Sequence, residues 1–147
     1  MAGHGTPAAE HGRRAADSRM PPTIVFQGSV DSTVRPVNAR RVAEQWLAFD
    51  QPRTPEPADP DRIARSAAST SRTGGRRCEV TRWYSARGRK RLEVWLVDGL
   101  GHAWAGGAPG GSYSDPRGPR ASTAMWRFFS TQRLPPAAVP APSIAPS

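Results

Sequence analysis

CEVTRWYSARGRKRLEVWLV, residues 78–97, holds two runs typical of β-strands, one on each side of a glycine. In the second run, Leu92, Val94 and Leu96 alternate with Glu93, Trp95 and Val97. This period of two places the two sets of side chains on opposite faces of a strand. Gly88 supplies the positive φ that a tight connection needs. The stretch therefore predicts a β-hairpin, or at least two consecutive strands.

Three further elements are predicted outside this hairpin. The run TIVF, residues 23–26, lies between two prolines and Gly28 and indicates a buried strand. From Pro36, apolar residues recur every three or four positions and predict a helix whose core stripe is Ala39, Val42, Ala43, Trp46 and Phe49 or Asp50. Near the end, residues 119–132 predict a second helix with the stripe Ala121, Ala124, Met125 and Phe128 or Phe129.

The order strand, helix, long loop, two strands, helix is typical of an α/β domain. We expect the domain to span residues 21–133, with an irregular, exposed excursion at residues 51–75, where prolines and small polar residues gather. A loop or disordered lead-in is expected at residues 1–20 and a disordered Pro/Ala-rich tail at residues 134–147. A complete doubly wound sheet would need more strands before Thr23, so we expect an incomplete sheet. We infer that the chain is the C-terminal portion of a larger protein.

The chain carries a net charge of +9, and its basic residues concentrate between Arg76 and Arg91. This segment is either a solvated hairpin face or a phosphate-binding surface. The single cysteine, Cys78, excludes an internal disulfide and is expected to be a small buried apolar group.

His4 and His11 have no nearby metal-ligand partners, so neither a metal nor a cofactor is expected. No stretch resembles a membrane span, and the N-terminus lacks the apolar region of a secretory signal, which leaves the localisation open.

Two polar residues follow the ends of predicted strands. Asp31 lies five residues after Phe26, and His102 lies five residues after Val97. Functional groups of open α/β sheets collect at such strand ends, where a carboxylate can orient an imidazole as a general base. The alternative is that both are solvent-exposed turn residues. Asp115, in the run SDPRGP, is expected to cap a turn or the following helix.

The segments PPTIVFQGSVDSTVRPVNARRVAEQW and LEVWLVDGLGHAWAGGAPGGSYSDPRGPRASTAMWRFF resemble the C-terminal part of polyhydroxybutyrate-depolymerase-type and feruloyl esterases, a family of α/β-hydrolases. The resemblance covers about residues 20–130. It implies the C-terminal part of an α/β-hydrolase fold, with Asp31 as the triad acid of an H-G-x-x-D-x-x-V-x-x-x-N pattern and His102 as the triad base of G-H-x-W. Val34 and Asn38 also match, whereas the leading histidine is Gln27 here.

The nucleophile of that family is a serine in a G-x-S-x-G turn upstream of the aspartate, and this pattern is absent. Ser112 follows the histidine, Ser29 and Ser32 flank Asp31, and Cys78 lies inside a predicted strand, so none of them replaces it. Trp104 and Tyr113 either line an ester pocket or hold the glycine-rich loop against the domain.

The leading hypothesis is the C-terminal part of a serine carboxylic-ester hydrolase, inactive alone, that keeps the triad acid and base but lacks the nucleophile. Its implied partners are a polyester or an aromatic or aliphatic ester, and a complementing N-terminal half. One alternative is a basic module that binds polyanions through the hairpin of residues 76–91, although no specific nucleic acid is expected. The other is a catalytically inactive scaffold.

Overall fold

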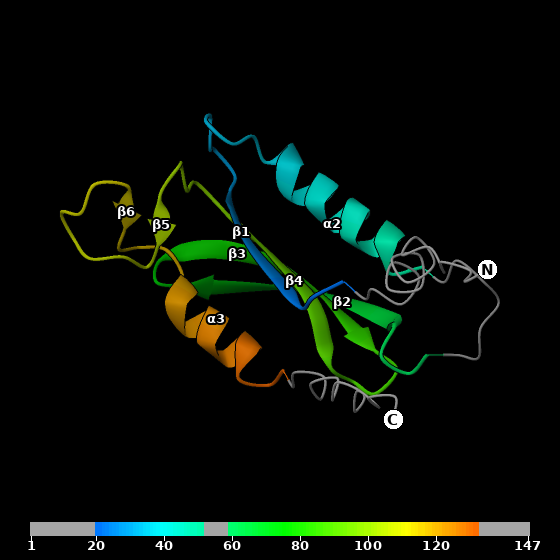
Figure 1. The fold of residues 1–147 in the computed structure, drawn as a ribbon. Coiled ribbons are helices and arrows are strands. Elements are labelled where there is room, and N and C mark those ends of the chain that lie inside the picture. The colour runs from blue at the N-terminus through cyan, green and yellow to red at the C-terminus, as the bar shows by residue number, and fades with distance from the viewer. Residues whose placement is uncertain (1–19, 52–58, 133–147) are drawn as a thin grey trace, which may run out of the picture.

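The fold is centred on a four-stranded sheet in the order β1-β4-β3-β2 (Figure 1). The structure is a computed structural model that describes residues 20–51 and 59–132. β1 (Thr23–Gly28) runs parallel to β4 (Lys90–Val97), while β3 (Arg76–Ser85) is antiparallel to β4 and to β2 (Ile63–Thr73). This mixed sheet, with helices packed on it, confirms the expected α/β class.

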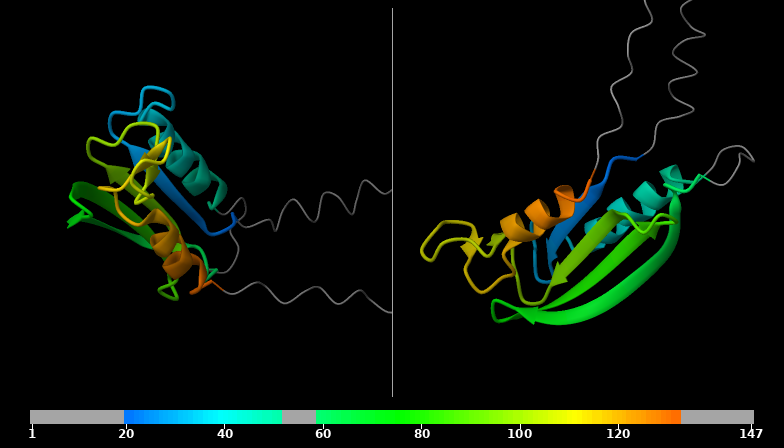
Figure 2. Two further views of the ribbon diagram at one scale, coloured as in Figure 1. Left: turned by 90° about the vertical axis from the view of Figure 1, so that its left-hand side faces the viewer. Right: turned by 90° about the horizontal axis from the view of Figure 1, so that it is seen from below.

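Two helices cover opposite faces of the sheet (Figure 2). They are α2 (Val37–Phe49) and α3 (Ala121–Phe129). Two short parallel strands, β5 (Trp104–Ala105) and β6 (Ser114–Asp115), form a separate ladder within the loop between β4 and α3. Residues 1–19 and 134–147 lie outside the described residues, so the expectations for the lead-in and the tail stay predictions, as do those for His4 and His11. Of the lead-in, only Met20 is described.

The predicted hairpin is confirmed as β3 and β4, with strand ends one or two residues beyond those expected. Gly88 has a φ of +76° in the connection, and its N–H donates to the Ser85 carbonyl at 2.8 Å. Residues with a positive φ are rare unless they lack a Cβ, so the glycine permits this turn.

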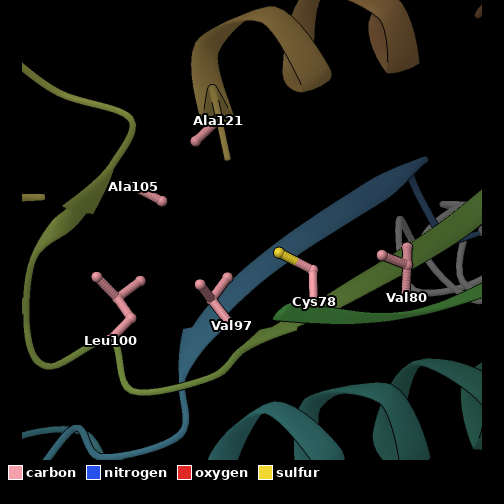
Figure 3. Packing of buried hydrophobic residues seen from close by; sticks show 6 residues of the cluster. All are labelled: Cys78, Val80, Val97, Leu100, Ala105 and Ala121. Atoms are coloured by element: carbon pink, nitrogen blue, oxygen red, sulfur yellow. The ribbon is translucent and has the colours of Figure 1, made fainter. Parts of the chain in front are cut away.

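Because its side chains alternate, β4 contributes buried residues to the hydrophobic clusters on both faces of the sheet. Leu92 is fully buried with Trp46 on the α2 side. On the α3 side, Val97 packs with Cys78, Val80, Leu100, Ala105 and Ala121, as Figure 3 shows. Cys78 is 0% exposed, which confirms that it is a small buried apolar group.

Helix α2 buries a narrower stripe than the sequence pattern predicted. Ala39, Ala43 and Trp46 are buried, and of the two candidates at the end it is Asp50 that is buried. Val42 is 41% exposed, so its assignment to the core was wrong, and Phe49, the other candidate at the end, is 59% exposed. They flank the buried stripe at helical spacing, and no described element covers that flank.

The interpretation of residues 51–75 as wholly irregular was also wrong. β2 occupies Ile63–Thr73 of this range and pairs with β3 over its length, with an irregularity between Ile63 and Arg65. Its residues after Ile63 are all exposed, as expected for a surface segment. A strand forms without an apolar pattern because β3 offers a free edge whose backbone groups need partners.

In α3, Ala121 and Phe128 are buried, whereas Phe129 is 45% exposed. The side chain of Gln132, just after the helix, donates to the Lys90 carbonyl at the start of β4 at 3.0 Å. Helix α3 therefore runs antiparallel to β4, on the face opposite α2.

Candidate functional site

The candidate site lies where β1 and β4 end side by side. The two strands are parallel, and their register pairs Gly28 with Val97, the last residue of each. Two backbone hydrogen bonds continue the contact beyond the strands, from the Ser29 N–H to the Val97 carbonyl at 2.9 Å and from the Val30 N–H to the Leu100 carbonyl at 3.1 Å. The loops that carry Asp31 and His102 are thus joined at their base.

Glycine at position 28 permits this close contact. A Cβ at Gly28 would lie 2.1 Å from the Leu100 carbonyl oxygen and 2.8 Å from that of Gly101. Ser29 adds a side-chain link, because its hydroxyl accepts from the Gly99 N–H at 2.8 Å and contacts an Asp98 carboxylate oxygen at 3.2 Å. Sequence reasoning considered Ser29 only as a nucleophile and missed this structural role.

Asp31 and His102, 71 residues apart in sequence, are in direct contact. The distance between Asp31 Oδ2 and His102 Nδ1 is 3.0 Å. The other carboxylate oxygen, Oδ1, accepts from the backbone N–H groups of Thr33 at 2.9 Å and Val34 at 2.8 Å. The structure therefore brings together the two residues that the sequence assigned as acid and base.

The pKa of Asp31 lies below its usual value, chiefly because the Val34 N–H donates to the carboxylate. Desolvation opposes this shift, while the contacts with His102 and the Thr33 N–H reinforce it. An ionised carboxylate only accepts hydrogen bonds, so Nδ1 of a neutral His102 carries the proton. Its Nε2 then has a free lone pair, and it makes no hydrogen bond with the described residues.

Gln27 fixes the loop that presents Asp31. It is 6% exposed, and its amide nitrogen donates to the carbonyls of Val34 at 2.8 Å and Gly28 at 3.1 Å. The amide thus connects the two ends of the loop that contains Asp31. The sequence showed Gln27 only as a departure from the family pattern, and nothing in the pattern indicated which backbone groups it holds.

Trp104 and Tyr113 are brought together beside His102. The Trp104 N–H donates to the Tyr113 carbonyl at 2.7 Å across β5 and β6, and the rings of His102 and Tyr113 meet edge to face at 6.3 Å. Tyr113 adopts a φ of 54° and is 77% exposed, and Trp104 is 50% exposed. Both rings are exposed beside a half-exposed imidazole, so they are accessible to a ligand. That they line an ester pocket, or that they hold the glycine-rich loop against the domain, stays a prediction in either case.

No described hydroxyl or thiol group is hydrogen-bonded to His102. Ser112 is exposed in the loop between β5 and β6, and the Ser29 hydroxyl is held by Asp98 and Gly99. Burial raises the pKa of the Cys78 thiol in the core, which disfavours its reactive thiolate. Residues 20–51 and 59–132 thus contain an oriented imidazole without a group for it to deprotonate.

Asp115 anchors the long loop after β4. Its carboxylate accepts from the Arg117 N–H at 3.0 Å and forms a close ion pair with the Arg76 guanidinium. Burial by itself would raise the pKa of Asp115, but the bonds from Arg76 and Arg117 outweigh it and lower the pKa. The expected turn cap at Asp115 is confirmed, and Arg76 is an additional partner that the sequence did not reveal.

The basic residues of the hairpin contact acceptors within the chain. Arg76 pairs with Asp115, Arg77 with Glu79, Arg82 and Lys90 with buried Glu93, Arg87 and Arg89 with Asp61, and Arg91 with the Met20 carbonyl. A phosphate would have to compete with these acceptors for each cation.

Over the part of the chain that the structure describes, no helix is long and apolar enough to cross a membrane. The same residues contain no group of three or more histidine, cysteine or carboxylate side chains placed to bind a metal ion. No protein-family model matches the chain, and no curated protein matches it either.

Proposed function

We propose that this chain is the C-terminal part of a serine carboxylic-ester hydrolase with an α/β-hydrolase fold, related to polyhydroxybutyrate depolymerases and feruloyl esterases. Asp31 is the orienting acid and His102 the general base. The contact of 3.0 Å between Asp31 Oδ2 and His102 Nδ1 carries the proposal. It joins two residues that simple chain proximity would not bring together, at the carboxyl ends of adjacent parallel strands.

The chemistry follows from this arrangement. His102 Nε2 accepts the proton of a nucleophilic hydroxyl as the oxygen attacks an ester carbonyl, and it returns that proton to the leaving alkoxide. Asp31 holds the ring by Nδ1 and stabilises the imidazolium that forms. The nucleophile belongs to a segment other than the described residues, and loss of a triad serine costs about six orders of magnitude in turnover. The chain alone is therefore inactive.

Two measurements with p-nitrophenyl acetate test this proposal. The purified chain is expected to hydrolyse the ester no faster than buffer, and hydrolysis that disappears in His102→Ala would contradict the predicted inactivity. The chain is then extended upstream through its own reading frame to include a strand and a G-x-S-x-G turn, which should restore hydrolysis. The restored activity should fall in both Asp31→Asn and His102→Ala, whereas the exposed control Ala48→Ser should retain it. Absence of such a turn in the upstream DNA would leave the chain a true fragment, whereas an extended chain that contains the turn and still hydrolyses no ester would refute the proposal.

A further inference from the structure

Tyr113 has a strained backbone conformation. Its φ of 54° lies in the left-handed region, and among the described residues it is the one non-glycine residue with a positive φ. This conformation is unfavourable for a bulky L-residue, because its Cβ crowds the following carbonyl oxygen. Burial of the side chain does not compensate, since Tyr113 is 77% exposed. Strain of this kind persists where the surrounding structure enforces it, and it often marks a functional residue.

The chain on both sides of Tyr113 enforces this conformation. On one side, the Tyr113 carbonyl accepts from the Trp104 N–H at 2.7 Å, and the strand β6 that follows ends at Asp115, whose carboxylate forms an ion pair with the first residue of β3. On the other side, the loop turns where the Gly111 N–H donates to the Ala108 carbonyl at 3.3 Å. Because the backbone is held on both sides, the φ of Tyr113 sets the direction in which its side chain leaves the loop.

The ring of Tyr113 lies against the ring of His102. The two rings meet edge to face, with their centroids 6.3 Å apart and an angle of 79° between their planes. Aromatic rings attract each other in this geometry at centroid separations of about 4.5–7 Å. β5 begins two residues after His102, so the short ladder of β5 and β6 (Figure 1) also holds the backbone next to the imidazole.

The imidazole of His102 needs a second restraint of this kind. Its ring is held by one hydrogen bond, between Nδ1 and Asp31 at 3.0 Å, and its side chain is 49% exposed. A single bond at one corner fixes the position of Nδ1 but leaves the ring free to tilt about it, and a tilt displaces Nε2. Groups that transfer protons act only within a narrow range of distances and angles. The contact with Tyr113 restrains this tilt.

We propose that Tyr113 is a positioning residue, which holds the imidazole of His102 in the orientation that proton transfer needs, and that the loop between β5 and β6 keeps Tyr113 strained for this purpose. The inference rests on the proposed function, because that function makes His102 the general base. It differs from both roles that the sequence predicted for Tyr113, since the partner of the ring is the base itself. The ring makes the contact, so the hydroxyl group is dispensable.

Three substitutions in the full chain separate the ring from the strain. Tyr113→Phe keeps both, Tyr113→Ala removes the ring and keeps the strain, and Tyr113→Gly removes both. NMR measures the exchange of the His102 Nδ1 proton with water. This exchange should become at least tenfold faster in Tyr113→Ala and in Tyr113→Gly and should not change in Tyr113→Phe. Circular dichroism confirms that each variant folds.

Urea denaturation of the same variants measures the strain. The unfolding equilibrium constant of Tyr113→Gly should be about fourfold smaller than that of Tyr113→Ala, because the relief of strain exceeds the extra entropy of an unfolded glycine. At a position without strain the order is reversed. A smaller constant for Tyr113→Ala than for Tyr113→Gly would therefore overturn the proposal.

The extended chain that contains the G-x-S-x-G turn tests the catalytic consequence. Tyr113→Ala should lower kcat about tenfold and leave KM unchanged, whereas Tyr113→Phe should keep both values. A rise in KM alone would assign the ring to an ester pocket and overturn the inference. An active extended chain in which Tyr113→Ala changes neither kcat nor Nδ1 exchange would also overturn it and leave the proposed function intact. An inactive extended wild type would refute the proposed function and, with it, the role of Tyr113.

Discussion

Gly28→Ala is expected to separate the two halves of the candidate site. The added Cβ would lie 2.1 Å from the Leu100 carbonyl oxygen, whereas ordinary carbon–oxygen contacts begin at about 3.3 Å. The end of β1 and the loop after β4 must therefore move apart by roughly 1 Å. Such a shift breaks the hydrogen bond from the Val30 N–H to the Leu100 carbonyl, now 3.1 Å, and strains the contact between Asp31 and His102.

Two contributions determine how much Gly28→Ala lowers the free energy of unfolding. Overpacking of a close contact destabilises by about 1–3 kcal/mol, and each lost backbone hydrogen bond adds about 0.5–1.5 kcal/mol. We expect Gly28→Ala to lower the free energy of unfolding by about 2–4 kcal/mol. Urea denaturation followed by tryptophan fluorescence measures this change, and NMR of the His102 ring reports whether its contact with Asp31 persists.

Gly101→Ala is the matched control. It lies next to Leu100 in the loop after β4, and a Cβ there would have no atom within 4 Å. The free energy of unfolding of this variant should lie within about 0.5 kcal/mol of the wild-type value. If Gly28→Ala is equally stable and its His102 ring spectrum is unchanged, the close approach at Gly28 does not hold the two loops together.

Two other variants and one chemical modification probe the surroundings of the site and the core. Gln27→Leu removes the donor to the Val34 carbonyl and should lower the free energy of unfolding by about 1–3 kcal/mol in urea denaturation. Asp115 has a lowered pKa, so its contribution to stability is present above the unfolded value of about 3.9 and is lost as the pH falls through the folded value. Arg76→Ala should therefore lower stability at pH 6 more than at pH 3. Cys78, fully buried and with a raised pKa, should react with an aromatic disulfide reagent only on unfolding.

Each of these expectations has an outcome that contradicts it. Wild-type stability of Gln27→Leu would show that the Asp31 loop keeps its shape without the amide. A parallel loss of stability at both pH values in Arg76→Ala would mean that the ion pair with Asp115 does not cause the acid sensitivity. Rapid modification of Cys78 in the native chain, at a rate independent of urea, would be inconsistent with its burial.

The sequence by itself determined the elements that carry their own local pattern. The alternation in residues 91–97, the helical spacing after Pro36 and the turn at Gly88 each follow from neighbouring residues, and all three were predicted correctly. The positions of Asp31 and His102 after strand ends were equally readable, because strand ends are where an α/β sheet places polar side chains.

Only the tertiary structure decided which residues are paired or covered by segments far away in the sequence. β2 has no apolar period and forms because β3 provides hydrogen-bonding partners. Val42 has the chemical character of a core residue but lies on a flank of α2 that no described element covers. The contact between His102 and Asp31 depends on parallel pairing of β1 with β4 and on the missing Cβ of Gly28. Such pairings join residues far apart in sequence, so no local pattern encodes them.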